Sequence, residues 1–431
     1  MRSFLYPPAF LIGSVILSCT SDETPTAPGA DKPAQPEVTQ VAGVSMKDVL
    51  RVQDLGTLGG AQAGADDINE RGQVTGGAAT LLEPSGHVYR WSRERGMRDL
   101  GTLGGGISGG VGLNDRGDVT GVSRTANEAD HAFLWTERHG MQDLGTLGGP
   151  DSYGSAVNNR HQVAGDSPLS AGDGGRRRPF LWTAAGGMRN LGTLGGPGSD
   201  VWGTDINDHS QVVGILFPDG LEGESPTRAY RWTPERGMQD LGTLGGRSAQ
   251  AWSINERGEI TGGSSDADGL FQAFLWSPRR GMQPLGAFAG GVAVGYSVNR
   301  HQVVVGESAD QDFRFLPFVW TKRTGMRALP IAEVGGVEGA ARGVDDKNEI
   351  SGYIITADGL SRAVLWQPRR DRDLLTATIT ETVGEFEVAA VGAPSAAPRG
   401  KDADGCRHGR QFALRVAPTN AGASSPACLG R

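Results

Sequence analysis

Five aspartates carry the carboxyl groups whose places in the sequence could support catalysis. They lie in or directly after short segments that otherwise hold mostly Gly, Ala, Ser, Val and Asn: Asp66, Asp67, Asp205, Asp345 and Asp346. Two carboxyl groups facing one glycosidic bond can serve as general acid and as base or nucleophile. The chemistry open to these residues is therefore hydrolysis or elimination on a polysaccharide, and Asp67 and Asp205 are the first two to test.

Two charged segments of unusual length favour binding instead. Segment 166–178 ends in three arginines and segment 215–228 contains three acidic residues; these are Arg176, Arg177 and Arg178, and Asp219, Glu222 and Glu224. Variable loops on a rigid scaffold are the usual place for binding, although solvated loops also drift in length without a function. A basic loop followed by an acidic loop indicates a polarised face for a protein or glycan partner.

Other motifs lack the context that their chemistry needs. Residues 106–110 fit the G-x-S-x-G pattern, and Gly104, Gly106 and Gly109 fit G-x-G-x-x-G, but no helical pattern follows them. The seven histidines show no metal-ligand spacing. The Asp-Ala-Asp-Gly fragments at 266–269 and 402–405 lack the remaining ligands of a calcium loop. We therefore predict no metal ion and no cofactor, and we assign no catalytic residue.

The elements that would position these side chains belong to a repeat. The run Asp-Leu-Gly-Thr-Leu-Gly-Gly at 54–60 returns at 99, 143, 190 (with Asn) and 240, and it fades at 284 and 328. These seven starts lie 45, 44, 47, 50, 44 and 44 residues apart. A period of this size with strand-like segments is typical of a β-propeller. We therefore predict an all-β, seven-bladed propeller over residues 49–375.

Each repeat contains four short apolar segments separated by turn residues, which predicts four strands per blade. The first turn needs a left-handed residue, supplied by Gly72, Gly117 and Gly258. Asn348 holds the same place in the seventh repeat and tolerates this conformation next best, whereas His161, Ser210 and Gln302 hold it in other repeats and should carry modest strain. The third strand of every repeat carries a tryptophan, which we expect to pack between neighbouring blades.

Ring closure follows from a surplus fourth strand. Residues 50–56 precede the first inner strand, whereas the seventh repeat lacks the usual Gly-Met after Trp366. We predict that the N-terminal segment pairs with the strand holding Trp366 and closes the ring, which hides exposed edges. The alternative is that residues 373–375 complete the seventh blade and residues 50–56 add an outer strand.

The ends of the chain indicate export. An apolar stretch over residues 4–17 is too short to span a bilayer and is typical of a signal peptide over residues 1–18. Residues 16–19 resemble a bacterial lipobox, which implies lipid attachment at Cys19. Residues 19–48 lack apolar periodicity and predict a disordered tether. Residues 376–431 do not follow the repeat, and Cys406 and Cys428 within them could pair or remain free thiols.

The repeat resembles the HAF repeat of extracellular bacterial proteins. The triplet His131-Ala132-Phe133 carries the resemblance together with the tryptophan and the Asp-Leu-Gly-Thr-Leu-Gly-Gly run, over about residues 50–375. It implies an exported repeat protein and transfers no catalytic residue.

The net charge of −8 and the lack of a long basic run argue against nucleic acid as a partner. We therefore expect a monomeric lipoprotein of the outer membrane or cell surface, which touches the membrane through its lipid alone. Its function would be non-catalytic binding or scaffolding of a protein or glycan through the loop face. The alternative is an extracellular polysaccharide hydrolase or lyase with an axial site.

Overall fold

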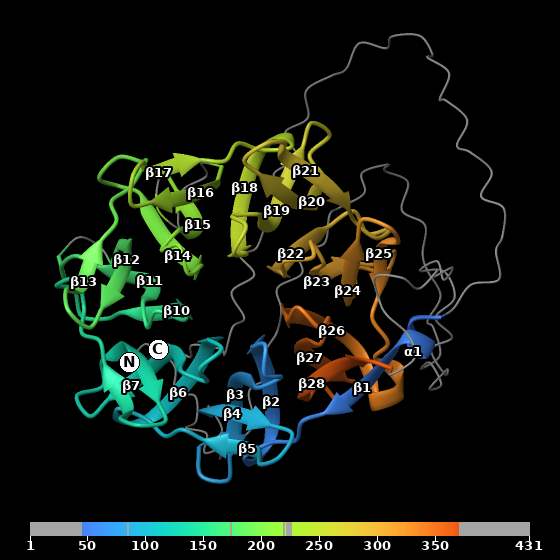
Figure 1. The fold of residues 1–431 in the computed structure, drawn as a ribbon, viewed down its shortest axis with the longest axis horizontal. Helices are drawn as coiled ribbons and strands as arrows, with labels where there is room; N and C mark the ends of the chain where they lie inside the picture. Colours follow the sequence, from blue (N-terminus) through green and yellow to red (C-terminus); the bar gives the residue numbers. More distant parts are fainter. Residues whose placement is uncertain (1–44, 84–85, 173–174, 219, 221–225, 370–431) are drawn as a thin grey trace, which may run out of the picture. The chain divides into compact units, whose positions relative to one another are not determined.

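Seven four-stranded antiparallel sheets form a closed ring, as predicted (Figure 1). The computed structural model describes residues 45–369, apart from 84–85, 173–174, 219 and 221–225. The signal peptide, Cys19, Cys406, Cys428 and the predicted C-terminal tail therefore lie outside the described residues. Among the described residues, no helix has the length and apolar character to cross a membrane.

The two inner strands of each blade form its wall toward the ring axis. The innermost strands are β2 (Gly59–Ile68), β6 (Gly104–Leu113), β10 (Tyr153–Val157), β14 (Asp200–Ile206), β18 (Gly245–Ile254), β22 (Ala293–Val298) and β26 (Gly336–Val344). Their partners are β3 (Val74–Thr80), β7 (Val119–Thr125), β11 (Val163–Pro168), β15 (Val212–Phe217), β19 (Ile260–Asp266), β23 (Val304–Ala309) and β27 (Ile350–Thr356). Blades are numbered 1 to 7 in this order.

The third and fourth strands form the periphery. The third strands are β4 (His87–Ser92), β8 (Asp130–Thr136), β12 (Arg177–Thr183), β16 (Arg228–Thr233), β20 (Phe271–Ser277), β24 (Phe315–Thr321) and β28 (Ser361–Pro368). The outermost strands of blades 1 to 6 are β5 (Gly96–Asp99), β9 (Gly140–Asp143), β13 (Gly187–Asn190), β17 (Gly237–Asp240), β21 (Gly281–Gly286) and β25 (Gly325–Ala328). A short 3₁₀ helix, η1 (Ala332–Val334), precedes blade 7.

The N-terminal strand closes the ring, which confirms the predicted closure. β1 (Leu50–Asp54) is the outermost strand of blade 7 and pairs antiparallel with β28, with Val52 opposite Trp366. The helix α1 (Met46–Val49) precedes β1, and its Met46 and Val49 are buried. Helix α1 therefore overlaps the end of the predicted tether, residues 19–48.

The turns between the first and second strands confirm the predicted left-handed positions. Gly72, Gly117 and Gly258 have positive φ, and His161, Ser210, Gln302 and Asn348 adopt φ values of 57° to 63°. Each turn is organised by one side chain: Asn207 Oδ1 accepts the N–H groups of His209 and Gln211. Its Nδ2 donates to the carbonyl of Asn255 in the next blade at 3.1 Å. The turn thereby joins neighbouring blades.

The repeated tryptophans pack between blades as expected. Trp91 of blade 1 belongs to one apolar cluster with Ala363 and Leu365 of blade 7. Trp232 of blade 4 likewise packs with Leu181 of blade 3. Burying these indoles is a large apolar contribution at each blade interface.

The strand order places two sets of connections on each face of the ring. Turns between first and second strands and between third and fourth strands share one face, here called the turn face. Connections between second and third strands, and crossings to the next blade, share the other face, here called the loop face.

Candidate functional site: the axial pocket

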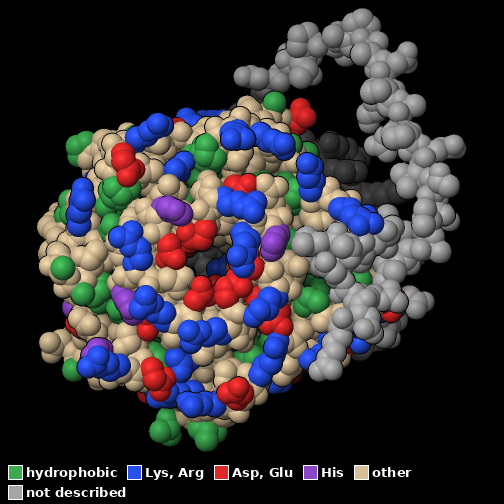
Figure 2. Space-filling view, in the orientation of Figure 1, with side chains coloured by type: hydrophobic (Ala, Val, Ile, Leu, Met, Phe, Trp, Pro, Cys, Tyr) green, Lys and Arg blue, Asp and Glu red, His purple; other side chains and the backbone are tan. Residues whose placement is uncertain are grey.

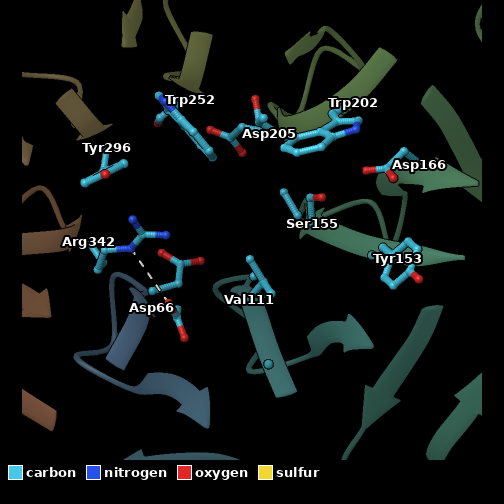
Figure 3. Close-up of a pocket in the computed structure, with 18 of the residues that line it drawn as sticks. Asp66, Val111, Tyr153, Ser155, Asp166, Trp202, Asp205, Trp252, Tyr296 and Arg342 are labelled. Atoms are coloured by element: carbon cyan, nitrogen blue, oxygen red, sulfur yellow. Dashed lines mark ion pairs between the residues drawn. The ribbon is translucent and has the colours of Figure 1, made fainter. Parts of the chain in front are cut away.

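A β-bulge recurs at one position of all seven innermost strands. In each inner ladder the register skips a single residue, three positions before the turn. A bulge leaves its extra residue unpaired and re-aims the side chain. The seven bulge residues all line a cavity of about 230 Å³ on the ring axis, here called the axial pocket: Asp66, Val111, Ser155, Thr204, Trp252, Tyr296 and Arg342. Figure 3 shows the labelled ones converging on this space.

The bulge residues divide the pocket into a crowded side and an open side. Blades 5, 6, 7 and 1 contribute Trp252, Tyr296, Arg342 and Asp66. At the bulge positions, blades 2 to 4 contribute the smaller residues Val111, Ser155 and Thr204, among glycine backbone. Because large and small side chains face each other across the axis, the space is asymmetric. It is smaller than the roughly 300–1,000 Å³ of pockets for drug-sized ligands.

The crowded side is a continuous series of contacts. The rings of Trp252 and Tyr296 meet edge-on, with centroids 5.6 Å apart. The Arg342 guanidinium lies 4.1 Å over the Tyr296 ring, and Arg342 approaches Asp66 to 3.8 Å. Tyr296 donates its hydroxyl proton to Glu307 at 2.8 Å behind this wall. The Tyr296 ring is therefore held from the back, while Arg342 and Asp66 line the cavity (Figure 3).

A second aromatic group lies toward the loop face. Tyr153 begins β10 and Arg177 begins β12, so both occupy the loop-face end of blade 3. Arg177 lies 4.2 Å over the Tyr153 ring and 5.5 Å from the centre of the Trp202 ring. It also pairs with Asp166 at 3.1 Å, and all four residues line the pocket.

Asp67 and Asp205 lie in the pocket wall, but their oxygens are committed to the scaffold. Asp67 accepts the N–H of Ile68 with one oxygen and that of Leu113, in the next blade, with the other, both at 2.8 Å. Asp205 repeats the arrangement with Ile206 and with Ile254 of the next blade. Both residues therefore link neighbouring blades through hydrogen bonds.

Burial raises the pKa of each carboxyl group in the pocket. The pKa of Asp66 rises to about 6 although the charge of Arg342 opposes the shift. The pKa of Asp205 also rises to about 6, that of Asp166 to about 7 and that of Asp67 to about 8. These groups therefore hold protons more tightly than exposed carboxyl groups do, although Asp66 and Asp205 remain mostly ionised at pH 7.

A polar rim surrounds the axis at the turn face. It consists of one residue from each first turn: Glu70, Asp115, Asn159, Asp208, Glu256, Arg300 and Asp346. Apart from Arg300, each rim side chain accepts the backbone N–H of the preceding rim residue, at 2.7 to 2.9 Å. Figure 2 shows acidic side chains around a central hollow on the face that it views. Asp346 therefore belongs to this rim around the axis and does not line the pocket.

The remaining predicted site residues separate from one another. Arg176 is exposed, and Arg177 reaches the pocket. Arg178 is buried and donates to the carbonyls of Ser199 and Pro197, so it supports the crossing between blades 3 and 4. Asp345 is buried in its turn. Asp219, Glu222 and Glu224 lie outside the described residues.

Sequence reasoning missed Tyr153, Trp202, Trp252, Tyr296 and Arg342. The sequence did hold a signal for Trp252, Tyr296 and Arg342. Each repeat has an Asn or Asp that begins the first turn, and the residue three positions before it varies strongly among the seven repeats: Asp, Val, Ser, Thr, Trp, Tyr and Arg. Within the described ranges, no group of three or more His, Cys, Asp or Glu side chains is arranged to hold a metal ion.

Comparisons with known proteins leave the function open. No family model and no curated protein matches the chain. Solved structures resemble it weakly. TolB from Acinetobacter baumannii is 11% identical, with a TM-score of 0.38. The match covers 73% of this chain and 65% of the TolB chain.

A gluconolactonase from Xanthomonas campestris is 12% identical, with a TM-score of 0.40 over 80% of this chain and 99% of the other. The propeller domain of the Trilobed protease from Pyrococcus furiosus is 8% identical, with a TM-score of 0.46 over 72% and 98%.

Proposed function

We propose that this propeller is a non-catalytic binding protein that takes part of a protein or glycan partner into the axial pocket. The observation that carries the proposal is the set of seven bulges, which aim residues of very different chemistry at one cavity while the strands around them repeat. Variation confined to inward positions on a constant scaffold is what a ligand-specific site requires.

Exposed apolar side chains support contact with a partner at the loop face. Among the described residues, all large hydrophobic side chains with high exposure lie in connections of that face: Leu81, Leu82, Leu169, Leu194, Leu270 and Phe313. Leu82 is 90% exposed and Phe313 69%. Exposed apolar groups gathered on one face are typical of an interaction surface.

The alternative enzymatic role finds less support in the carboxyl groups. Cleavage of a glycosidic bond usually needs two available carboxyl groups. Asp67 and Asp205 bind backbone N–H groups with both oxygens, and Asp166 pairs with Arg177. Asp66 is then the one pocket carboxyl group without a hydrogen bond within the described part of the chain. Polysaccharide turnover that disappears in Asp66→Asn would favour the enzyme.

Filling the open side of the pocket tests the proposal. Ser155→Trp places an indole in the cavity, whereas Ser155→Ala removes the hydroxyl and leaves the space. We expect Ser155→Trp to lose binding on a glycan array and in capture of cell-envelope proteins, while Ser155→Ala retains it. Binding that is unchanged in a folded Ser155→Trp protein would show that the pocket is not the site.

The proposal includes an exported, lipid-anchored protein of the HAF-repeat type, on the basis of the N-terminal sequence and the repeat. Metabolic labelling with a fatty acid, compared between the natural chain and Cys19→Ser, tests the anchor; equal labelling of both would contradict it.

A further inference from the structure

The Asp66–Arg342 pair has unused hydrogen-bonding capacity inside the pocket. The side chains are only 7% and 14% exposed, and their nearest charged atoms are 3.8 Å apart, too far for a hydrogen bond. Neither side chain makes a hydrogen bond elsewhere within residues 45–369 as described. Both side chains line the cavity, so a ligand that enters it can accept from the guanidinium and donate to the carboxyl group at the same time.

The spacing of this pair suits hydroxyl groups. A hydroxyl both donates and accepts, so one hydroxyl, or two on adjacent carbons, can donate to the Asp66 carboxylate while accepting from Arg342. The Ser155 side chain lies on the opposite side of the cavity and has no hydrogen-bond partner in the described structure. Polar contacts are therefore available on opposite sides of the cavity.

The aromatic residues supply the remaining part of such a site. Trp252 and Tyr296 flank Arg342 on the crowded side, and Trp202 and Tyr153 line the loop-face end. Aromatic rings offer apolar surface to the C–H faces of a sugar, while a few placed polar groups fix its orientation. A cavity of about 230 Å³ restricts the bound part to about one ring.

The charges of the lining select against acidic ligands. Asp66, Asp67, Asp166 and Asp205 face two arginines, and each arginine already approaches a carboxyl group. A further carboxylate in this space would be desolvated beside Asp66 and Asp205, which are mostly ionised at pH 7 with pKa values of about 6. The lining therefore favours an uncharged ligand over a uronic or sialic acid.

We propose that the axial pocket binds one uncharged sugar ring, with its hydroxyls on Asp66 and Arg342 and its C–H face against the aromatic wall. This inference rests on the proposed function and names the ligand class for the same pocket. Part of a protein partner in the same pocket is the alternative that the test must exclude.

The test is calorimetric titration of the full chain with neutral methyl glycosides and with the corresponding uronic acids. We expect neutral glycosides to bind, the uronic acids to bind at least about tenfold more weakly, and Asp66→Ala and Arg342→Ala each to weaken binding about tenfold or more. Arg138→Ala, exposed in the turn between β8 and β9 on the turn face, is the control that should bind as the natural chain does. Unfolding temperatures of all variants establish that they fold.

Two results would overturn the sugar assignment. Equal binding of neutral and acidic sugars would contradict the selection by charge. Failure of every sugar to bind, with envelope proteins still captured in a manner that Ser155→Trp abolishes, would overturn the sugar and leave the binding function standing. The binding function would be overturned too if the natural chain bound neither sugars nor envelope proteins, or if Ser155→Trp changed neither kind of binding.

Discussion

At the residue scale, one turn differs from the other six in a way that has a measurable consequence. In blades 1 to 6 an asparagine Nδ2 donates to the carbonyl of the next turn, at 2.8 to 3.1 Å. In blade 7 that residue is Asp345, whose Oδ1 accepts the N–H groups of Lys347 and Glu349 as the asparagines do. Its Oδ2 therefore takes the place of Nδ2, and it is buried without a partner.

A proton on Asp345 would supply the missing donor toward Asn69 at the seam between blades 7 and 1. Burial raises the pKa of Asp345 to about 7, and the charge of Glu349 adds to the shift while Lys347 opposes it. Because the folded-state pKa lies above the unfolded value of about 3.9, the folded state holds the proton more tightly. The stability that this provides is complete at acid pH and disappears as the pH rises from about 4 through about 7.

We predict that Asp345→Asn stabilises the protein at pH 8 by about 1 kcal/mol or more and has its smallest effect near pH 4, because an amide donates at both pH values. The measurement is the free energy of unfolding in denaturant at each pH. Asn207→Asp is the matched control, since it creates the same acidic turn elsewhere and should lose stability mainly at pH 8. Parallel pH profiles for Asp345→Asn and the natural chain would exclude this account.

At the element scale, close approach between the two inner strands explains the glycine in each second strand. A Cβ added to Gly76 would lie 2.1 Å from the Gly64 carbonyl oxygen. In blades 2 to 6 the corresponding distance is 1.9 Å, at Gly121, Gly165, Gly214, Gly262 and Gly306. This approach occurs beside the bulge, so the glycine permits the geometry that aims the bulge residue at the axis.

We predict that Gly76→Ala lowers the free energy of unfolding by about 1–3 kcal/mol, because the strands must separate to admit the methyl group. Gly64→Ala, in the facing strand, is the control: nothing lies within 4 Å of its added Cβ, and it should change stability by less than about 0.5 kcal/mol. Chemical denaturation of both variants checks the difference. Similar losses in the two would mean that the close approach is unimportant.

Much of this element-level structure is predictable from the sequence, and the pocket is not. The period, the turn residues and the tryptophans each impose one local requirement, so they predict the blades directly. Trp252 and Tyr296 escaped prediction because an alternating strand pattern does not reveal which residue a bulge will expel. Asp67 and Asp205, singled out from the sequence, do line the pocket, but their hydrogen bonds to the next blade depend on the packing of blades against each other.

At the scale of the whole molecule, the ring depends on a joint between distant parts of the chain. Val49 and Leu50 are fully buried, and β1 supplies the outer strand of blade 7. Leu55 then continues into blade 1 and donates its N–H to Ala363 at 2.9 Å. Separation of β1 would expose the edge of β28 and the apolar cluster that contains Val49 and Leu50.

We predict that Leu50→Ala lowers the free energy of unfolding by about 2–5 kcal/mol, the usual cost of truncating a fully buried leucine. Arg51→Ala, one residue further on an exposed position, should cost less than about 1 kcal/mol. Thermal unfolding followed by tryptophan fluorescence distinguishes the two. A small effect of Leu50→Ala would indicate that closure by β1 contributes little to stability.

The recurrence of the bulge also bears on how such a protein can change its specificity over evolution. Seven inward side chains occupy one register position, and each belongs to a different blade. A substitution at any of them alters the lining while the turns, the tryptophans and the glycines that maintain the scaffold stay the same. Under the proposed binding function, the ligand of such a propeller can therefore change one blade at a time.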